Sequence, residues 1–150
     1  DGWNARMDGL QGAVLGIKLK HLARSNDLRR QHAASYQELL SGLPLVLPTV
    51  ADYALPVFHI YAVRVAARDR VLAEMQGEGV SCGIHYPVPV HLMKAYEHLK
   101  VPAGSLPVAE RCAAEFLSLP MYPELTQDQL AFVRESMATV LDRETCPAGT

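Results

Sequence analysis

Residues 57–65 read VFHIYAVRV, and this stretch decides the fold class. It is rich in β-branched and aromatic residues, which favour a strand more strongly than any other stretch of the chain. Successive side chains of a strand point to opposite faces, so His59 and Tyr61 are expected half-exposed on one face, opposite Phe58 and Ile60. The sequence therefore predicts a sheet near the middle of the chain.

Helical patterns lie on both sides of this strand. Apolar residues recur at three- and four-residue steps from residue 7 to residue 17, and Asp8 fits the N-cap of a capping box. Thr126 fits the same role before a last helix at residues 127–141. Other helices are expected at residues 25–40, 69–76, 92–99 and 106–116, and further strands at 81–86 and 117–119. The fold class predicted is α/β or α+β, with a sheet of three or four strands.

Two features of the first helix stay open. Gly9, Gly12 and Gly16 fall on adjacent turns, and each costs about 1 kcal/mol relative to alanine in a helix interior. They indicate either a face pressed against another backbone or glycines tolerated by tertiary packing. The pattern does not decide whether the helix continues through residues 20–24 into the next one.

Composition excludes several classes of protein. The 150 residues carry a formal net charge of −2, which gives no basic footprint for nucleic acid. No apolar run approaches the roughly 18 residues needed to cross a bilayer. Cys82, Cys112 and Cys146 form no CxxC pair, which excludes a disulfide framework and a zinc ribbon and predicts a cytoplasmic protein. The start Asp1-Gly2-Trp3-Asn4 has neither a Met nor a signal sequence, so we expect a piece of a longer chain.

Two segments could carry chemistry. Asn4 and Arg6 stand just before a helix start, where an amide, a guanidinium and first-turn N–H groups could hold a phosphate. His85, Tyr86 and His91 lie in a proline-bounded corner at a strand end, typical of a binding loop. The spacing of the two histidines fits no metal site, and no Gly-x-Ser-x-Gly elbow occurs. From these residues alone, solvated-loop or structural roles remain open.

Several blocks, in order, resemble the DegT/DnrJ/StrS family of pyridoxal-phosphate sugar aminotransferases. They read GWNARMDGLQGAVL at residues 2–15, HIY at 59–61, GIHYPVPVH at 83–91 and LSLPMYP at 117–123. The resemblance covers almost the whole chain, from residue 2 to about residue 141. It departs from the common pattern at Gly12, where alanine is usual.

The resemblance implies the C-terminal portion of an aspartate-aminotransferase-like (fold type I) enzyme, with a small sheet packed with helices. Residues 1–41 would end the large domain and form interface helices, residues 42–141 the small α+β domain, and residues 142–150 a disordered tail. The family's catalytic lysine would lie upstream, so the chain alone would be inactive. The implied reaction transfers an amino group, usually from glutamate, to a nucleotide-linked keto-sugar in polysaccharide or antibiotic biosynthesis.

The resemblance also implies roles for single residues. Asn4 would reach the phosphate of pyridoxal 5'-phosphate in the partner subunit of a homodimer, with Arg6 nearby. His85, Tyr86 and His91 would border the nucleotide-sugar pocket, with His59 and Tyr61 as weaker candidates. Two alternatives remain: a pyridoxal-phosphate sugar dehydratase of the same fold, and a non-catalytic regulatory or interaction relative.

Overall fold

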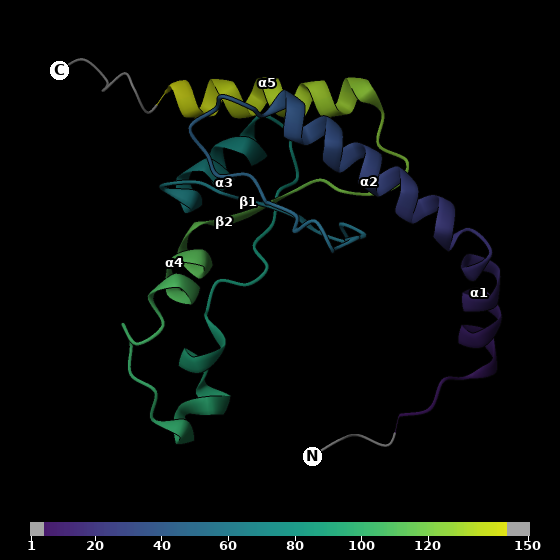
Figure 1. The fold of residues 1–150 in the computed structure, drawn as a ribbon, viewed down its shortest axis with the longest axis horizontal. Coiled ribbons are helices and arrows are strands. Elements are labelled where there is room, and N and C mark those ends of the chain that lie inside the picture. The colour runs from purple at the N-terminus through teal and green to yellow at the C-terminus, as the bar shows by residue number, and fades with distance from the viewer. Residues whose placement is uncertain (1–4, 144–150) are drawn as a thin grey trace.

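The computed structural model describes residues 5–143. The elements in chain order are α1 (Gly9–Leu19), α2 (Leu22–Leu39), β1 (Tyr61–Arg64), α3 (Arg68–Gly77), the 3-10 helices η1 (Val90–Leu92) and η2 (Lys94–Leu99), α4 (Pro107–Glu115), β2 (Phe116–Leu119) and α5 (Gln127–Asp142). Figure 1 shows α2 and α5 along one side, with α1 and the α4 region extending on opposite flanks. The helix–strand composition confirms the predicted fold class.

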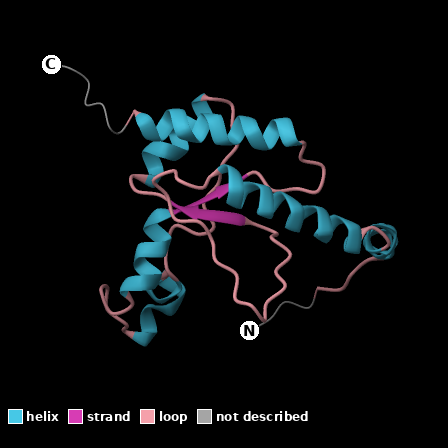
Figure 2. Ribbon diagram, turned by 45° about the horizontal axis from the view of Figure 1, so that its top comes forward, coloured by secondary structure: helices cyan, strands magenta, loops and turns pink. Residues whose placement is uncertain are grey.

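The sheet is smaller than predicted. In the described part of the chain, β1 and β2 form an antiparallel pair in which Val63 lies opposite Leu117 (Figure 2). Single bridges join Val46 to Arg64 and Gly83 to Ser118, and the second of these lies where the strand at 81–86 was expected. The expectation of three or four strands, including one at 81–86, is therefore wrong.

The reason lies in the segment after Gly83. Gly83 N–H donates to the Ser118 carbonyl at 3.0 Å, and Ser118 N–H donates to the Gly83 carbonyl at 2.8 Å. Pro87 and Pro89 follow closely, and proline has no N–H with which to continue a ladder. The pairing therefore stops after one bridge.

The central strand is also shorter than predicted. Phe58 has φ of +48°, a left-handed conformation, and β1 begins only at Tyr61. The side-chain alternation therefore does not extend back to His59, which is exposed, whereas Tyr61 is 1% exposed. The expectation that these two residues share a half-exposed face is wrong.

The core lies where α2, α3 and α5 meet the two strands. Residues that are fully or almost fully buried come from all of these elements: Tyr36, Leu40, Val63, Val71, Met75, Leu117, Leu130, Met137 and Val140. The C-terminal half of α2 thus shares one core with the segment expected to form the small domain. The domain boundary at residues 41 and 42 stays a prediction.

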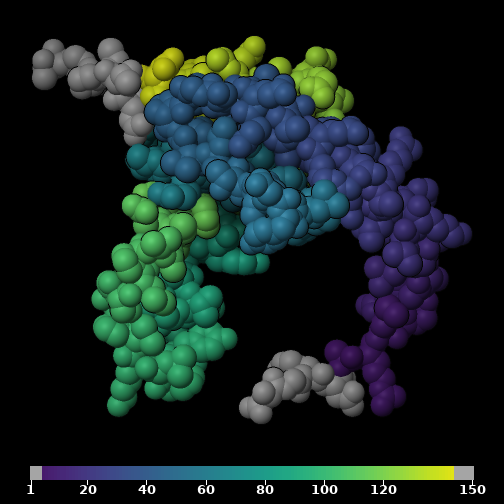
Figure 3. Space-filling view, viewed as in Figure 1, coloured from purple at the N-terminus to yellow at the C-terminus, as the bar shows by residue number. Residues whose placement is uncertain are grey.

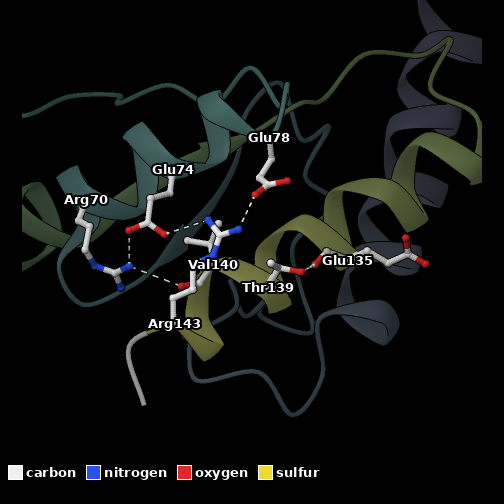
Figure 4. Close-up of polar contacts among 7 residues, drawn as sticks. All are labelled: Arg70, Glu74, Glu78, Glu135, Thr139, Val140 and Arg143. Atoms are coloured by element: carbon white, nitrogen blue, oxygen red, sulfur yellow. Dashed lines mark hydrogen bonds and ion pairs between the residues drawn. The ribbon is translucent and has the colours of Figure 1, made fainter. Parts of the chain in front are cut away.

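Charged side chains join α3 to the end of α5 (Figure 4). Glu74 Oε1 accepts a hydrogen bond from Arg70 Nη1 at 2.7 Å, and Glu74 Oε2 lies 3.7 Å from Arg143 Nη1. Arg143 Nη2 also donates to Glu78 Oε1 at 2.9 Å. Because α5 runs to Asp142 and Arg143 is held in this cluster, the expected tail does not begin at residue 142. Its remainder, residues 144–150, lies outside the described residues.

Local signals predicted the helix ends better than they predicted the helix types. Both capping boxes are present, at Asp8 and at Thr126, as expected. Lys20 and His21 separate α1 from α2, which answers the question of continuity. The helix expected at residues 92–99 consists instead of two 3-10 helices. No helix of the described residues is long and apolar enough to span a membrane.

Two parts of the molecule project from the core. One is α1, which has no buried residue. The other we call the lobe, residues 84–112, none of which is buried. The space-filling view shows them on opposite sides of an open hollow (Figure 3). A Cβ added at Gly9 or Gly16 would meet nothing within 4 Å, and one at Gly12 would meet only Met7 Cε at 3.9 Å, so no backbone of the described chain presses against this glycine face.

Candidate functional site

The candidate site is built around the bridge between Gly83 and β2. The bridge brings His85 next to Ser118, with His85 Nδ1 2.9 Å from Ser118 Oγ. A Cβ added at Gly83 would lie only 3.2 Å from His85 Cε1, so the glycine makes room for the imidazole. Ser118 is buried, and its hydroxyl therefore orients the ring. Among residues 5–143, no partner bonds the other ring nitrogen, which can donate to or accept from a ligand.

A cavity of about 330 Å³ opens beside this pair. It is lined by His59, His85 and Ser118, together with Ile60, Ser81, Cys82, Gly83, Leu119 and Met121. The fold thus brings together two of the predicted site residues, His59 and His85. The described residues contain no group of three or more side chains suited to hold a metal ion. Imidazole and hydroxyl groups thus supply the polar part of the lining of this cavity.

Cys82 also lines this cavity but is not suited to act as a nucleophile. Burial raises the pKa of its thiol to about 11. At neutral pH the group is protonated, and the thiol is much less nucleophilic than the thiolate. Cys82 therefore serves as a small apolar wall residue.

His85 also borders a second hollow on the lobe side, of about 630 Å³. Tyr86 and His91 line it with mainly apolar residues, among them Val88, Val90, Leu99, Leu106 and Phe116. Tyr86 is 73% exposed, and its ring meets that of His85 edge-on at 5.6 Å between centroids. His85, Tyr86 and His91 are thus neighbours, as the sequence predicted.

His91 differs from the other two because it is held inside the lobe. Its Nε2 lies 3.1 Å from Glu110 Oε1, and its side chain is 8% exposed. The same carboxylate accepts from the N–H groups of Gly104 and Leu106. The Gly104 hydrogen bond is the largest cause that lowers the pKa of Glu110, followed by those from Leu106 and His91. Glu110 therefore acts as an anchor for the lobe.

Tyr61, a weaker candidate, is a core residue. Its hydroxyl donates to Gln37 Oε1 at 2.8 Å, and its ring lies 5.1 Å from that of Tyr36. Burial raises the pKa of Tyr61 to about 12. The wall expected from His59 and Tyr61 together thus reduces to His59.

The predicted phosphate loop is described only in part. Arg6 is exposed, two residues before the N-cap Asp8, and makes no ion pair within residues 5–143. Asn4 lies outside the described residues. The guanidinium is available to an anion at the tip of the projecting α1.

The positions of the described lysines matter for any site that would hold pyridoxal phosphate. A lysine is needed to bind its aldehyde carbon, yet none of the lysines within residues 5–143 lines the cavity of His59 and His85. Lys18 and Lys20 lie on or next to α1, and Lys94 and Lys100 in the lobe, all exposed.

Sequence reasoning missed the groups that hold the site together. Ser118 lies in the block 117–123 that carried the family resemblance, but nothing in the sequence marked Ser118 and Glu110 as partners of His85 and His91. Arg68 is 7% exposed and donates to the carbonyls of Ala113 and Phe116, which ties the start of α3 to the junction of α4 and β2. A lone arginine before a predicted helix carries no signal that it will be buried.

This fold and cavity define a small α+β module with an open cavity that imidazole and hydroxyl groups line in part. Residues 1–138 match the family model of the DegT/DnrJ/EryC1/StrS aminotransferase family, and the chain belongs to that family. Fold class and resemblance are thereby confirmed.

Individual relatives agree with this family. The chain is 41% identical over 140 residues to a "Pleiotropic regulatory protein" of Geobacillus stearothermophilus, which covers 91% of this chain and 38% of that protein. It is also 41% identical over 143 residues to the dTDP-3-amino-3,4,6-trideoxy-alpha-D-glucose transaminase of Streptomyces venezuelae, covering 95% and 38%. The crystal structure of S. venezuelae DesV in complex with a ketimine intermediate superposes with a TM-score of 0.88 at 41% identity, covering 95% and 38%. The chain thus spans less than two fifths of the length of these relatives.

Proposed function

We propose that this chain is the C-terminal part of a pyridoxal-phosphate aminotransferase that moves an amino group from an amino acid, expected to be glutamate, to a nucleotide-linked keto-sugar. The family match over residues 1–138 carries this proposal. Relatives of two nucleotide classes support the sugar substrate: the dTDP-sugar transaminase of S. venezuelae, and a UDP-N-acetyl-3-dehydro-alpha-D-glucosamine aminotransferase of Acidithiobacillus ferrooxidans that is 40% identical. We expect a cytoplasmic homodimer.

In this function the module binds and orients the sugar nucleotide. His85, fixed by Ser118, offers its second ring nitrogen to a hydroxyl or phosphate oxygen of the substrate. Tyr86 and His59 border the same region from the lobe and from the loop before β1. His91 acts indirectly, through Glu110, by holding the lobe in place.

A turnover assay on the longer protein that contains this chain tests the proposal. With ¹⁵N-labelled glutamate and a dTDP- or UDP-linked keto-sugar, we expect an amino-sugar product that carries the label. His85→Asn should raise the KM for the sugar nucleotide more than it lowers kcat, since the residue binds rather than reacts. Tyr53→Phe is the matched control, because Tyr53 is 95% exposed and lines no cavity described above.

The same assay separates the alternatives. A product that has lost water and gained no nitrogen would identify the dehydratase and overturn amino transfer. The regulatory alternative has support in two relatives' names, the pleiotropic regulatory protein and a "sensory transduction protein EryC1" of Saccharopolyspora erythraea, which is 44% identical over 128 residues. Absence of both turnover and pyridoxal-phosphate binding would favour that alternative.

We further propose that Asn4 and Arg6 hold the cofactor phosphate of the partner subunit. An exposed guanidinium near the start of α1, with no ion pair among residues 5–143, is suited to reach a second subunit. Mixed dimers test this: one protomer carries Arg6→Gln, and the other lacks the upstream catalytic lysine. If Arg6 acts across the interface, one site of the mixed dimer is intact and activity returns. If Arg6 acts within its own subunit, mixing restores nothing.

A further inference from the structure

A larger cavity, of about 810 Å³, lies between the junction of α1 with α2 and two loops of the core. Leu15, Leu19 and Leu22 of the helices contribute apolar side chains to its lining. Tyr122 and Pro123 contribute the lining from one of the loops. The cavity shares His59 with the smaller cavity of His85, but none of the other residues of that site. It is therefore a separate, neighbouring hollow.

The charged lining of this cavity is predominantly positive. Lys18 and Arg29 contribute two cations, and Glu124 contributes the single carboxylate. His59 adds an imidazole that can donate a hydrogen bond. A cavity with this excess of positive charge and apolar walls raises the local concentration of anions.

Two adjacent arginines show why Arg29 stands out. Arg30 is paired with Asp27 one turn away on α2. Arg29 has no ion pair or hydrogen bond with any part of the described chain, and its Nη1 is closed off from water without a partner. A guanidinium stays charged at any physiological pH, and a buried N–H without an acceptor is costly. The positive charge of Arg29 at the cavity wall is thus not paired with any carboxylate of residues 5–143.

The loop that carries Tyr122 and Pro123 is held in place before any ligand binds. His32 Nε2 lies 3.0 Å from the Pro123 carbonyl, and the Tyr36 hydroxyl donates to the Pro120 carbonyl at 3.0 Å. Both residues belong to the buried face of α2, so the loop that carries Tyr122 and Pro123 is tied to the helix that carries Arg29. A ligand would find this cavity already formed.

We propose that this cavity is an oxyanion-binding site in which Arg29 is the main charged group and Lys18 a second one. The ligand is a carboxylate or phosphate with a short apolar stem that lies against the leucines. Because Nη1 is sealed, we expect the guanidinium to turn toward the bound anion and hold it in bidentate fashion. The site itself does not depend on the proposed function. The two candidate sources, an amino-acid donor's carboxylate and a nucleotide's diphosphate, do rest on it.

Titration of the 150-residue chain tests the site without cofactor or turnover. L-glutamate and uridine diphosphate are titrated separately, by calorimetry and by the shifts of backbone amides on α2. We expect at least one probe to bind, more weakly as salt increases. Arg29→Gln should weaken it about tenfold or more, since a charge-assisted hydrogen bond contributes about 1.5–3 kcal/mol. Arg30→Gln, the matched control, should leave affinity within about twofold, because its ion pair faces Asp27.

Two further variants keep the test decisive if Arg29→Gln does not fold. Arg29→Lys keeps the charge but loses the bidentate geometry, so it should bind with intermediate affinity. Glu124→Gln removes the exposed carboxylate from the lining and should strengthen binding. Circular dichroism melts establish that each variant is folded.

The possible outcomes separate the two sources and the two proposals. Arg29-dependent binding of glutamate supports the site with a carboxylate ligand, and Arg29-dependent binding of uridine diphosphate supports it with a phosphate ligand. No binding of either probe, or equal losses in the two arginine variants, overturns the site. Arg29-dependent binding in a protein that transfers no amino group would keep the site and overturn the proposed function. Amino transfer together with anion binding that does not depend on Arg29 would support the proposed function and overturn the anion site.

Discussion

Helices α1 and α5 begin in the same way and end up in opposite environments. Each opens with a complete capping box, Asp8 with Gln11 in α1 and Thr126 with Gln129 in α5. Helix α5 buries six residues, whereas α1 buries none and leaves Leu10 77% exposed. A helix start is thus determined by about four residues, but burial depends on which other elements lie within reach.

This difference separates two kinds of stability within one chain. The core, with α5 across it, is held by many apolar contacts that form and break together. Helix α1 and the lobe are held by their own hydrogen bonds and a few side-chain anchors. The projecting parts should therefore open without unfolding the core.

The largest expected effect comes from apolar truncation in the two helices. Met137→Ala in α5 should lower the free energy of unfolding by about 2–5 kcal/mol, because Met137 is fully buried. Leu10→Ala in α1 should change it by less than about 0.5 kcal/mol. Urea denaturation of the isolated chain, followed by circular dichroism, measures both. Equal losses would show that α1 unfolds together with the core, and the contrast would fail.

Removal of the caps should sharpen the same contrast at a smaller scale. Thr126→Ala should cost about 1 kcal/mol of global stability, because α5 folds with the core. Asp8→Ala removes an equivalent hydrogen bond but should fray only the start of α1. Amide exchange by NMR distinguishes local from global loss. A global loss from Asp8→Ala as large as that from Thr126→Ala would contradict the separation.

Parts of this contrast could be predicted from the sequence, and others could not. Capping and helix periodicity depend on neighbours in the chain, so the starts of α1 and α5 were correct. The sheet depends on partners far away: Ser118 pairs with Gly83 once, and two prolines then prevent a strand that the local composition favoured. Tyr61 was expected to be half-exposed but is buried, because Phe58 adopts a left-handed backbone conformation that interrupts the alternation just before the strand.

The candidate site shows the same division. His85, Tyr86 and His91 follow one another in a single block, and their grouping could be read from the sequence. The partners that decide their roles come from other elements: Ser118 orients His85 across 33 residues, and Glu110 holds His91 across 19. Arg29 and Arg30 look identical in sequence, and only the structure shows that Arg30 pairs with Asp27 while Arg29 has no partner in the described part of the chain.

The lobe gives a pH-dependent test, because it is held by Glu110 rather than by a core. Hydrogen bonds lower the pKa of Glu110 in the folded chain, with the Gly104 amide as the largest cause. A carboxyl with a depressed pKa contributes stability above its unfolded pKa of about 4.3 and loses it as pH falls through the folded value. We expect the Gly104 and Leu106 amides to lose protection in that acidic range, while amides of β1 keep theirs.

Glu110→Gln should abolish this pH dependence and leave the two amides weakly protected at neutral pH. Hydrogen exchange, corrected for the intrinsic rate at each pH, measures the change, and Glu97→Gln elsewhere in the lobe is the matched control. Simultaneous loss of protection in the lobe and in β1 would mean that the lobe is part of the cooperative core. Of the two projecting parts, only α1 would then be independent of the core.

The smallest expected effect concerns the glycines of α1, and one part of its test needs the longer protein. Gly16→Ala should stabilise the helical conformation of α1 by about 1 kcal/mol and so raise its helicity, since an added Cβ meets nothing within 4 Å. Global stability should not change, because α1 does not belong to the core. If the glycine face contacts a second subunit in the proposed homodimer, the same substitution should weaken dimerisation of the longer protein. Circular dichroism and sedimentation measure the two effects, and an unchanged dimer would place the interface on another face of α1.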